Sequence, residues 1–399
     1  MLKRARARVG PSDAQFLVAA FCAVAIAIGL GRFAYTPLLP LMQSQARLTH
    51  TLAGVLASAN LTGYLIGAFI ASQAALRAHR VAVIRWCAAL CILTTVLAAF
   101  PETGMWLASR FLSGMGSGCV FVLISSVVLD RAALESKPAW PAISFGGAGG
   151  GIALCGILVP ILAPLGGWQG AWLGLCAVFA IIALVTLPWI ADVQGSAQAD
   201  PRELRAIPAP RAGLFPWLFV VYGVEGLGYI IPATFMVAII AGTPSIARLA
   251  SLGWVIAGSV AIVAPLAWLK IGASLGRAPA LIFVLALQAG GIAVPALFHN
   301  AAGVVVGALA LGGTFSGISL LANALGRELY PIDSHVAVGR LTVSYGVGQI
   351  LGPLLATALN ARTGSYDPAL LAAALAVGLG ALVMGLGMTL NRPIRARAG

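Results

Sequence analysis

The amino-acid sequence predicts an all-α integral membrane protein with twelve transmembrane helices in two pseudo-symmetric six-helix bundles. The first observation is composition: 60% of the 399 residues are hydrophobic, 9% are charged, and the mean hydropathy is +0.99. A soluble domain this apolar would have too few polar groups to cover its surface. The other two observations are the apolar runs and the placement of the basic residues.

Twelve apolar runs are long enough to cross a bilayer, since a spanning helix needs roughly 20 apolar residues. We expect each run to form one span and the short gaps to form the connecting loops. The runs cover residues 14–41, 51–75, 81–100, 104–129, 140–162, 168–190, 214–241, 250–275, 278–297, 301–325, 337–359 and 368–390.

Basic residues occupy alternate gaps between these runs. Of the 24 Lys and Arg residues, 19 lie at the chain ends, in the even-numbered gaps or in the ends of runs that border those gaps, and two lie well inside runs. Only Arg47, Arg248 and Arg362 lie in the odd-numbered gaps. Short cytoplasmic loops retain an excess of Lys and Arg, so both termini are predicted to be cytoplasmic, with the chain in the inner (plasma) membrane. The net charge of +13 follows from this topology and from attraction to anionic lipid, so no nucleic-acid partner is expected.

A polar stretch in the middle of the chain separates the runs into two groups of six. It is rich in Pro, Ala and charged residues, which predicts a cytoplasmic linker. The predicted organisation is an amino-terminal tail, a first bundle, the linker, a second bundle and a carboxyl-terminal tail, at residues 1–13, 14–190, 191–213, 214–390 and 391–399.

The two halves resemble each other in sequence. Gly-Leu-Gly at 29–31 is matched by Gly-Leu-Gly at 226–228, an offset of 197, and the segment from Ser144 is matched by the segment from Ser344, an offset of 200. Similar offsets at equivalent runs favour a duplicated six-helix unit. Two such halves joined by a cytoplasmic linker are the plan of secondary transporters, which bind substrate near the midplane between the halves.

Glycine is concentrated at residues 146–151, where five of six positions are glycine. Each glycine weakens a helix by about 1 kcal/mol relative to alanine. We therefore expect a bend here, or a tight interface between the fifth and eighth spans.

Other function classes find little support in the sequence. It contains no phosphate-cradling loop, nucleophile–base pair or metal-binding cluster, so we expect neither direct use of ATP nor an enzyme, and no cofactor. The six cysteines lie within apolar runs without zinc or redox spacing, and we interpret them as packing residues.

Three strings point to a known family. The fourth run begins with Arg110, followed by Gly114, Gly116 and Gly118. The other two strings are GLGRFAYTPLLPLM at 29–42 and GQILGP at 348–353. The first string resembles the span-four motif of the major facilitator superfamily, and the other two resemble its YbfB/YjiJ branch. The resemblance covers all twelve runs and implies transport by alternating access, without naming a substrate.

One departure from the superfamily concerns the loop between the second and third spans. That loop usually carries an Asp that pairs with basic residues as a cytoplasmic gate. Here residues 60–80 contain no acid, and neither does the equivalent stretch 253–277. We therefore expect the gate to rest on packing, or on helix carboxyl ends, which attract cations.

Three formally charged residues lie well inside the predicted spans: Arg32, Arg110 and Glu225. A charge at this depth costs at least about 2.5–3.5 kcal/mol on insertion scales, so such residues usually face a water-filled cavity or one another. They are the principal candidates for substrate binding and coupling.

Glu225 is the only acid inside a span. A carboxyl that alternates between an apolar environment and the neighbourhood of an arginine can take up and release a proton. The alternative is a structural partner of an arginine that never titrates. Tyr222 and Tyr229, at i−3 and i+4, share its helix face and would place two hydroxyl groups beside the acid.

Each arginine has more than one possible role. Arg32, which takes the position of Tyr229 under the 197 offset, would either form a latch with Glu225 or bind a substrate carboxylate with its planar fork. By resemblance, Arg110 is linked to proton coupling or to the substrate cavity. For both arginines a purely structural contact is the alternative.

Tyr35, Tyr345 and Gln349 complete the predicted substrate-binding and coupling residues, with Asn60 and Tyr64 as further candidates. Tyr345 and Gln349 are four residues apart and so share a face of the eleventh span. For each aromatic residue alone, an interfacial or lipid-facing position is the alternative.

The sequence therefore predicts a secondary active transporter for a small organic anion or zwitterion, such as a carboxylate or an amino acid, coupled to protons. Two buried arginines against one buried glutamate favour this substrate class. The alternatives are a proton-driven efflux pump for amphipathic or aromatic compounds, and a passive facilitator or channel. The expected partners are the substrate, the proton and membrane lipids, with the chain acting as a monomer.

Overall fold

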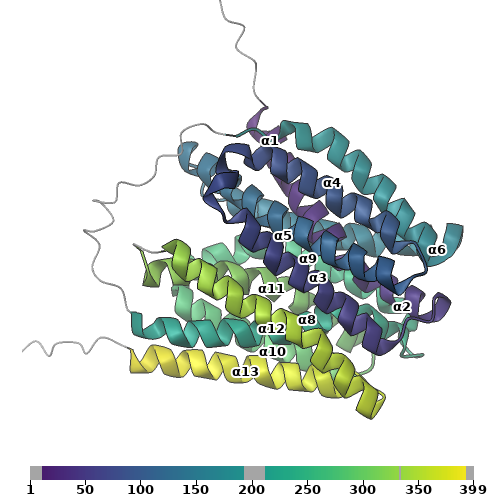
Figure 1. Ribbon diagram of the computed structural model, residues 1–399. Coiled ribbons are helices and arrows are strands. Elements are labelled where there is room, and N and C mark those ends of the chain that lie inside the picture. Colours follow the sequence, from purple (N-terminus) through teal and green to yellow (C-terminus); the bar gives the residue numbers. More distant parts are fainter. Residues whose placement is uncertain (1–10, 193–211, 332–333, 392–399) are drawn as a thin grey trace, which may run out of the picture.

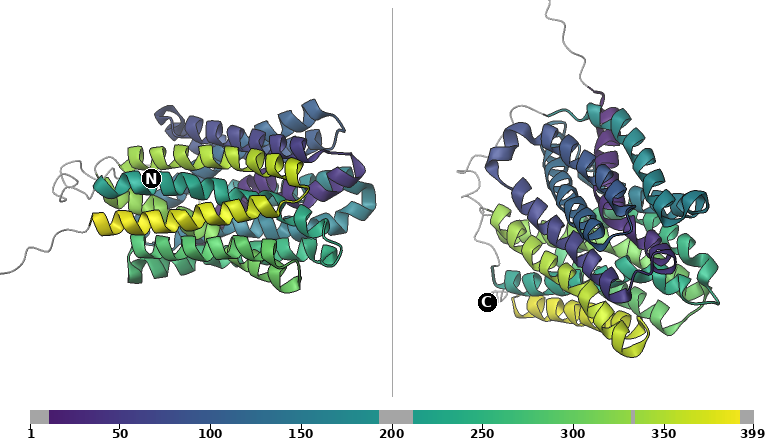
Figure 2. Two further views of the ribbon diagram at one scale, coloured as in Figure 1. Left: turned by 90° about the horizontal axis from the view of Figure 1, so that it is seen from below. Right: turned by 45° about the vertical axis from the view of Figure 1, so that its right-hand side comes forward.

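The computed structural model describes residues 11–192, 212–331 and 334–391, and in these ranges the chain is helical with short connections. The predicted tails and linker lie almost entirely outside the described residues, so their structure stays a prediction. Figure 1 shows the N-terminal helices, purple to teal-blue, packed against the C-terminal helices, which run from teal-green (α8) to yellow (α13). In Figure 2 most helix axes run in roughly the same direction.

The N-terminal helices precede residue 193. They are α1 (Asp13–Val24), η1 (Ala25–Phe33), α2 (Tyr35–Gln45), α3 (His50–Ala71), η2 (Ala74–His79), α4 (Arg80–Ala98), α5 (Thr103–Leu134), α6 (Trp140–Thr186) and η3 (Leu187–Trp189). The C-terminal helices follow residue 211. They are η4 (Ala212–Leu214), α8 (Phe215–Ala241), η5 (Ala247–Leu249), α9 (Ala250–Leu275), α10 (Arg277–Leu297), α11 (Ala301–Leu329), α12 (Ser334–Thr363) and α13 (Asp367–Leu390).

Eleven helices in the described part of the chain are long and apolar enough to cross a membrane, where the sequence predicts twelve spans. The difference lies in α6, which has 47 residues and contains the fifth run and most of the sixth. A straight helix of that length would measure about 70 Å, more than twice a hydrocarbon core of about 30 Å. The helix is interrupted at Gly166 and Gly167, and Gly167 has φ +62°, which favours glycine.

The two arms of α6 fold back on each other at this interruption. The Leu162 side chain lies against Gly174, so closely that a Cβ on Gly174 would be 2.6 Å from a Leu162 methyl carbon. In a straight helix these residues would be about 18 Å apart, so the contact requires a reversal of the chain. The Gln45 side chain accepts a hydrogen bond from the backbone N–H of Trp168 (2.9 Å), which caps the second arm.

The outer surface carries many large apolar side chains. Leu165, Trp86 and Leu184 are each more than 75% exposed, and dozens of other Leu, Ile, Val and Phe side chains are exposed around the helices. Such a surface is unfavourable in water and favourable against lipid tails. The molecule is therefore a multi-pass membrane protein.

The N-terminal and C-terminal helices meet along two seams, α6 with α9 and α3 with α12. In the first seam, a Cβ on Gly149 would lie 2.5 Å from the carbonyl oxygen of Gly258. A Cβ on Gly146 would lie 2.5 Å from the carbonyl oxygen of Ile262. The glycine-rich stretch thus lets two backbones approach closely, which confirms the predicted tight interface between the fifth and eighth spans.

The helices have two ends, which we name by the connections there. The tail end holds the first described residue, Pro11, the ends of the gap at 193–211, and Asn391. The distal end holds the connections 46–49, 99–102, 242–246, 298–300 and 364–366.

Two arginines at the tail end pair with acids that the sequence analysis did not consider. Arg80, at the start of α4, forms ion pairs with Asp130 near the end of α5 and with Asp192. Arg277, at the start of α10, pairs with Glu328 near the end of α11 (2.8 Å).

Arg277 meets the carboxyl end of a helix, as expected. Among the described residues, Arg80 instead donates only to side chains, chiefly those of two acids, which the expectation of packing or helix carboxyl ends left out. Arg277 donates a second hydrogen bond to the carbonyl oxygen of Ala324 (3.0 Å), which lies in the last turns of α11. Arg80 and Arg277 are related by the 197 offset, and Asp130 and Glu328 by an offset of 198. The internal repeat could therefore have indicated these ion pairs.

Candidate functional site

The first predicted span contains a π-helical segment, η1, flanked by α1 and α2. π-Helical turns are rare and are frequently found at functional sites. Here two of their carbonyl oxygens bind side chains of other helices. The Gly31 carbonyl accepts hydrogen bonds from Asn60 of α3 (3.0 Å) and Ser113 of α5 (2.7 Å). The Arg32 carbonyl accepts one from Arg110 of α5 (2.9 Å).

Arg110, Asn60 and Tyr35 therefore support the backbone around η1 and do not line the central cavity described below. The Arg110 guanidinium lies over the Tyr35 ring at 4.9 Å from its centre and is only 4% exposed. The Tyr35 hydroxyl donates to the carbonyl oxygen of Ala53 (3.2 Å). This arrangement matches the alternative for Arg110 in which it ties neighbouring helices together.

The Arg32 side chain points from η1 toward the C-terminal helices. Its Nη2 donates a hydrogen bond to the Tyr229 hydroxyl (2.7 Å), which also accepts one from Gln349 Nε2 (2.6 Å). The guanidinium carbon is 5.0 Å from the Phe33 ring centre and 5.1 Å from that of Tyr64. Arg32 Nε has no partner among the described residues. The guanidinium is thus positioned by aromatic rings and keeps donor capacity for a ligand.

Four parallel aromatic rings, which we call the aromatic stack, extend beside Arg32. Tyr222 and Tyr345 are 4.4 Å apart between ring centres, Tyr345 and Tyr229 are 5.6 Å apart, and Tyr229 and Phe315 are 6.2 Å apart. The angle between ring planes is 13° or less in each pair. These rings come from α8, α12 and α11, so three C-terminal helices contribute to one wall.

Arg32 and the aromatic stack enclose a central cavity of about 120 Å³ between the N-terminal and C-terminal helices. Its lining contains one formally charged residue, Arg32. The lining residues are Ile28, Arg32, Phe33, Tyr64, Leu65, Phe121, Phe145, Ala148, Tyr222, Tyr229, Phe315, Ser316, Ser319, Asn323, Thr342, Tyr345, Gly346 and Gln349.

The cavity is more exposed toward the tail end. Tyr229 and Gln349 are buried at its deep end, whereas Asn323 and Thr342, nearer the tail end, are partly exposed. Near the deep end the Thr36 hydroxyl donates to the Ala233 carbonyl (2.8 Å), so α2 and α8 are joined there.

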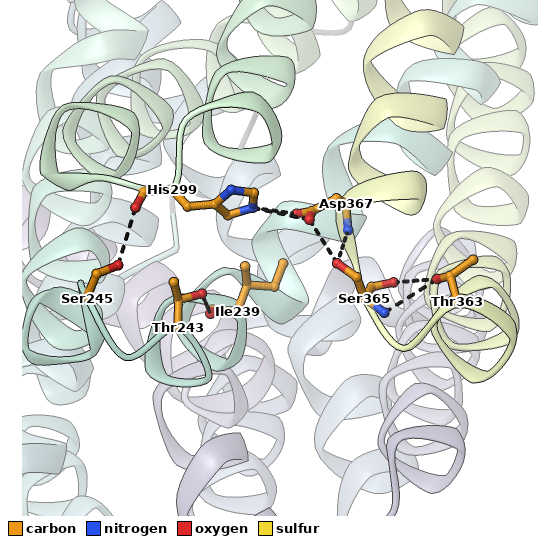
Figure 3. A network of polar contacts seen from close by, with 7 residues as sticks. All are labelled: Ile239, Thr243, Ser245, His299, Thr363, Ser365 and Asp367. Carbon is orange, nitrogen blue, oxygen red and sulfur yellow. Dashed lines mark hydrogen bonds and ion pairs between the residues drawn. The ribbon is translucent and has the colours of Figure 1, made fainter.

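The distal end is closed by further contacts between the N-terminal and C-terminal helices. The Ser58 hydroxyl donates to the Ile350 carbonyl (2.8 Å), and His50 Nδ1 is 3.1 Å from the Tyr366 hydroxyl. Nearby polar contacts join the distal connections of the C-terminal helices, as Figure 3 shows. In that network His299 Nε2 is 3.1 Å from both carboxylate oxygens of Asp367.

Glu225 does not line the cavity, although Tyr222 and Tyr229 do. Its side chain is 0% exposed, and neither carboxylate oxygen has a hydrogen-bond partner in the described structure. Gln288 of α10 faces it, and this side chain is also 0% exposed and also without a hydrogen bond in the described structure.

The direct latch between Arg32 and Glu225 is absent from this conformation, because the Arg32 guanidinium binds Tyr229 instead. The two tyrosine hydroxyls do not bind Glu225 either. That of Tyr229 receives Arg32 and Gln349, and that of Tyr222 receives a long bond from Asn323 (3.4 Å).

Sequence reasoning missed Gln288, Asn323 and Ser316, all of which lie within apolar runs. An uncharged amide inside a span, the residue type of the candidates Asn60 and Gln349, was the available signal for the first two. Phe33 and Phe315 gave no comparable signal, because phenylalanine is ordinary in a span.

A family model described as an uncharacterised MFS-type transporter, YbfB, matches residues 24–385. The benzoate transport protein of Acinetobacter baylyi is 33% identical over 141 residues, 34% of this chain and 30% of that protein. The uncharacterized MFS-type transporter YceJ of Bacillus subtilis is 35% identical over 101 residues, 25% of this chain and 26% of that protein. Each match thus covers less than a third of the relative's length.

Two solved transporter structures share the fold. The nucleoside transporter NupG gives a TM-score of 0.69 at 15% identity, covering 93% of this chain and 99% of that chain. An auto-inhibited peptide transporter of the POT family gives 0.70 at 12% identity, covering 97% and 99%. With the family model matched over most of its length, this chain belongs to the family of uncharacterised MFS-type transporters represented by YbfB.

Proposed function

We propose that this protein is a secondary active transporter that moves small aromatic carboxylates across the inner membrane by alternating access, coupled to protons. The observation that carries this proposal is the Arg32 guanidinium, held in a cavity of aromatic rings as the one charged group of the lining. A single buried cation attracts an anion. Its planar fork suits a carboxylate, which accepts two parallel hydrogen bonds.

The aromatic stack favours an aromatic anion over an aliphatic one. Parallel or edge-on contacts between rings contribute about 0.5–1.5 kcal/mol beyond the burial of apolar area. Tyr345, Tyr229 and Phe315 present ring surfaces near the arginine that would bind the carboxylate. The benzoate transport protein of Acinetobacter baylyi, which matches a third of this chain, supports the same substrate class.

We propose a topology of twelve spans in two bundles of six, with the two arms of α6 as the fifth and sixth spans. The tail end, where the basic residues gather, would then face the cytoplasm together with both termini. The contacts at the distal end and the partial exposure near Asn323 correspond to an inward-facing state. Rocking of the two bundles about the cavity would open the distal end. The chain would act as a monomer in contact with membrane lipids. Its activity would be transport and not catalysis.

Glu225 is the proposed proton carrier. Among the acids of the described spans it is the one that lies away from the span ends, and its buried carboxyl has no basic partner within ion-pair distance in the part of the chain that the structure describes. An ionised carboxylate in that position is unfavourable, so a proton would be bound in this state and released when rocking changes the surroundings.

Uptake into proteoliposomes tests the function. Benzoate, aliphatic carboxylates, amino acids and amphipathic dyes are offered with an imposed pH gradient to wild-type protein and to Arg32→Gln. Arg248→Gln is the control, because Arg248 is exposed at the distal end. We expect gradient-driven benzoate uptake that Arg32→Gln loses and Arg248→Gln retains.

Other outcomes would select the alternatives. Dye transport that does not depend on Arg32, without carboxylate transport, would indicate an efflux pump and contradict the proposal. Flux that ignores the pH gradient and shows no counterflow would indicate a passive facilitator or channel.

A further inference from the structure

The buried pair of Glu225 and Gln288 lies near the middle of the membrane-spanning region. They are the eleventh residue of α8 and the twelfth of α10, and both helices begin at the tail end. At about 1.5 Å per residue, both side chains lie roughly 17 Å along their helices, near the centre of a hydrocarbon core of about 30 Å. Water is scarce at that depth, so polar groups there must satisfy one another.

All four polar atoms of the two side chains lack a hydrogen bond. These are both carboxylate oxygens of Glu225, and Oε1 and Nε2 of Gln288. An ionised carboxylate can only accept hydrogen bonds, whereas a protonated one donates a single bond and still accepts. The amide of Gln288 both donates and accepts.

These capacities match only when the carboxyl is protonated. With Glu225 ionised, Gln288 Nε2 can donate to a carboxylate oxygen, but Gln288 Oε1 is left without a donor. With Glu225 protonated, its O–H donates to Gln288 Oε1 while Nε2 donates to the second carboxyl oxygen. One proton therefore completes the hydrogen bonding of all four atoms.

The pair lies apart from the central cavity. Tyr222 and Tyr229 line the cavity, and Glu225, on the same helix, does not. On the side of α13, α8 meets Val377 and Ala373, which carry no polar side-chain atoms. The other titratable and charged groups that face the carboxyl come from η1, α12 and α8 itself, namely Arg32, Tyr345, Tyr222 and Tyr229.

We propose that Glu225 and Gln288 form a proton-binding site separate from the substrate cavity. In this site the Gln288 amide positions the protonated carboxyl and satisfies its hydrogen bonds. This inference rests on the proposed proton-coupled transport and adds the residue that makes the site selective for a proton. The proton comes from one aqueous phase and returns to the other, and no covalent bond of the substrate changes.

Infrared difference spectroscopy of the purified full-length protein tests the pairing without any transport. Acidification of the wild type should produce a carboxylic C=O band that Glu225→Gln lacks. In Gln288→Leu the band should move to higher frequency, because the C=O group has lost its hydrogen bond. Gln288→Asn, which keeps an amide but shortens its reach, should also shift the band. Gln169→Leu, at a glutamine that binds the Ala99 carbonyl elsewhere, should leave it unchanged.

Transport gives the second readout. In Gln288→Leu, benzoate accumulation driven by a pH gradient should fall about tenfold, the effect of leaving one buried hydrogen-bonding group unpaired. Benzoate exchange at equal pH should continue, because Gln288 does not line the substrate cavity.

The outcomes separate this inference from the proposed function. Wild-type levels of accumulation in Gln288→Leu, together with an unshifted band, would overturn the pairing while benzoate transport stood. A wild type that carries no carboxylate would overturn the proposed function, and the infrared band would still report whether the two side chains pair.

Discussion

The buried polar side chains of the two halves are used differently. In the N-terminal helices, Asn60, Ser113 and Arg110 all donate hydrogen bonds to the backbone of η1. In the C-terminal helices, Glu225 and Gln288 are fully buried and make no hydrogen bond in the described structure. In this protein the first group of buried polar side chains holds a backbone in place, and the second remains available to bind.

The largest expected effect concerns the unpaired carboxyl. Glu225→Gln replaces it with an amide that cannot bind and release a proton, so benzoate accumulation driven by a pH gradient should disappear while exchange at equal pH survives. Accumulation ratios in proteoliposomes measure both. Glu102→Gln, at the exposed start of α5, is the matched control. Accumulation that persists in Glu225→Gln would remove this residue from coupling and weaken the contrast between the halves.

The second effect concerns stability in the N-terminal helices. Asn60→Leu removes donors to the carbonyl oxygens of Gly31 and Arg110. Because hydrogen bonds between membrane helices contribute about 0.6–1.7 kcal/mol each, the variant should lose about 1–3 kcal/mol of stability. Thermal unfolding in detergent measures this. Thr314→Val, which removes a bond within one helix only, should lose less. An unchanged melting temperature in Asn60→Leu would contradict a supporting role.

A smaller effect is expected within the aromatic stack. Tyr345→Leu removes one ring, so the affinity for benzoate should fall about 2–10-fold, which corresponds to about 0.5–1.5 kcal/mol. Competition between benzoate and cyclohexanecarboxylate measures it, because the saturated ring cannot stack in the same way. Equal losses for both compounds would indicate that the tyrosine contributes only apolar surface.

The smallest effect is expected at Arg110. If it ties α5 to η1 without touching substrate, Arg110→Lys should lower the melting temperature. It should leave the half-saturating benzoate concentration within about twofold of wild type, a change of about 0.5 kcal/mol. A shift beyond tenfold would place Arg110 in the binding site. The division between supporting and binding groups would then fail.

Much of the architecture was predictable from local properties of the chain. Run length and charge placement indicated a multi-pass membrane protein, and the glycines at 146–151 indicated a close helix contact. The repeat offset of 197 also relates two residues that touch in the structure: Arg32 donates a hydrogen bond to Tyr229, the residue at the equivalent position of the second half. The interruption at Gly166 and Gly167 was anticipated only as a gap between two runs.

The partners of the buried polar groups could not be predicted in the same way. The apolar sequence on both sides of Arg32, Arg110 and Glu225 indicated that they lie inside the membrane, because the hydrophobicity that identifies a span is summed over neighbouring residues. Which group each one meets depends on the rotation and packing of helices that are distant in sequence. The packing directs Arg32 to Tyr229 and Arg110 to the Arg32 carbonyl, and it leaves Glu225 facing Gln288 from a helix 63 residues further along the chain.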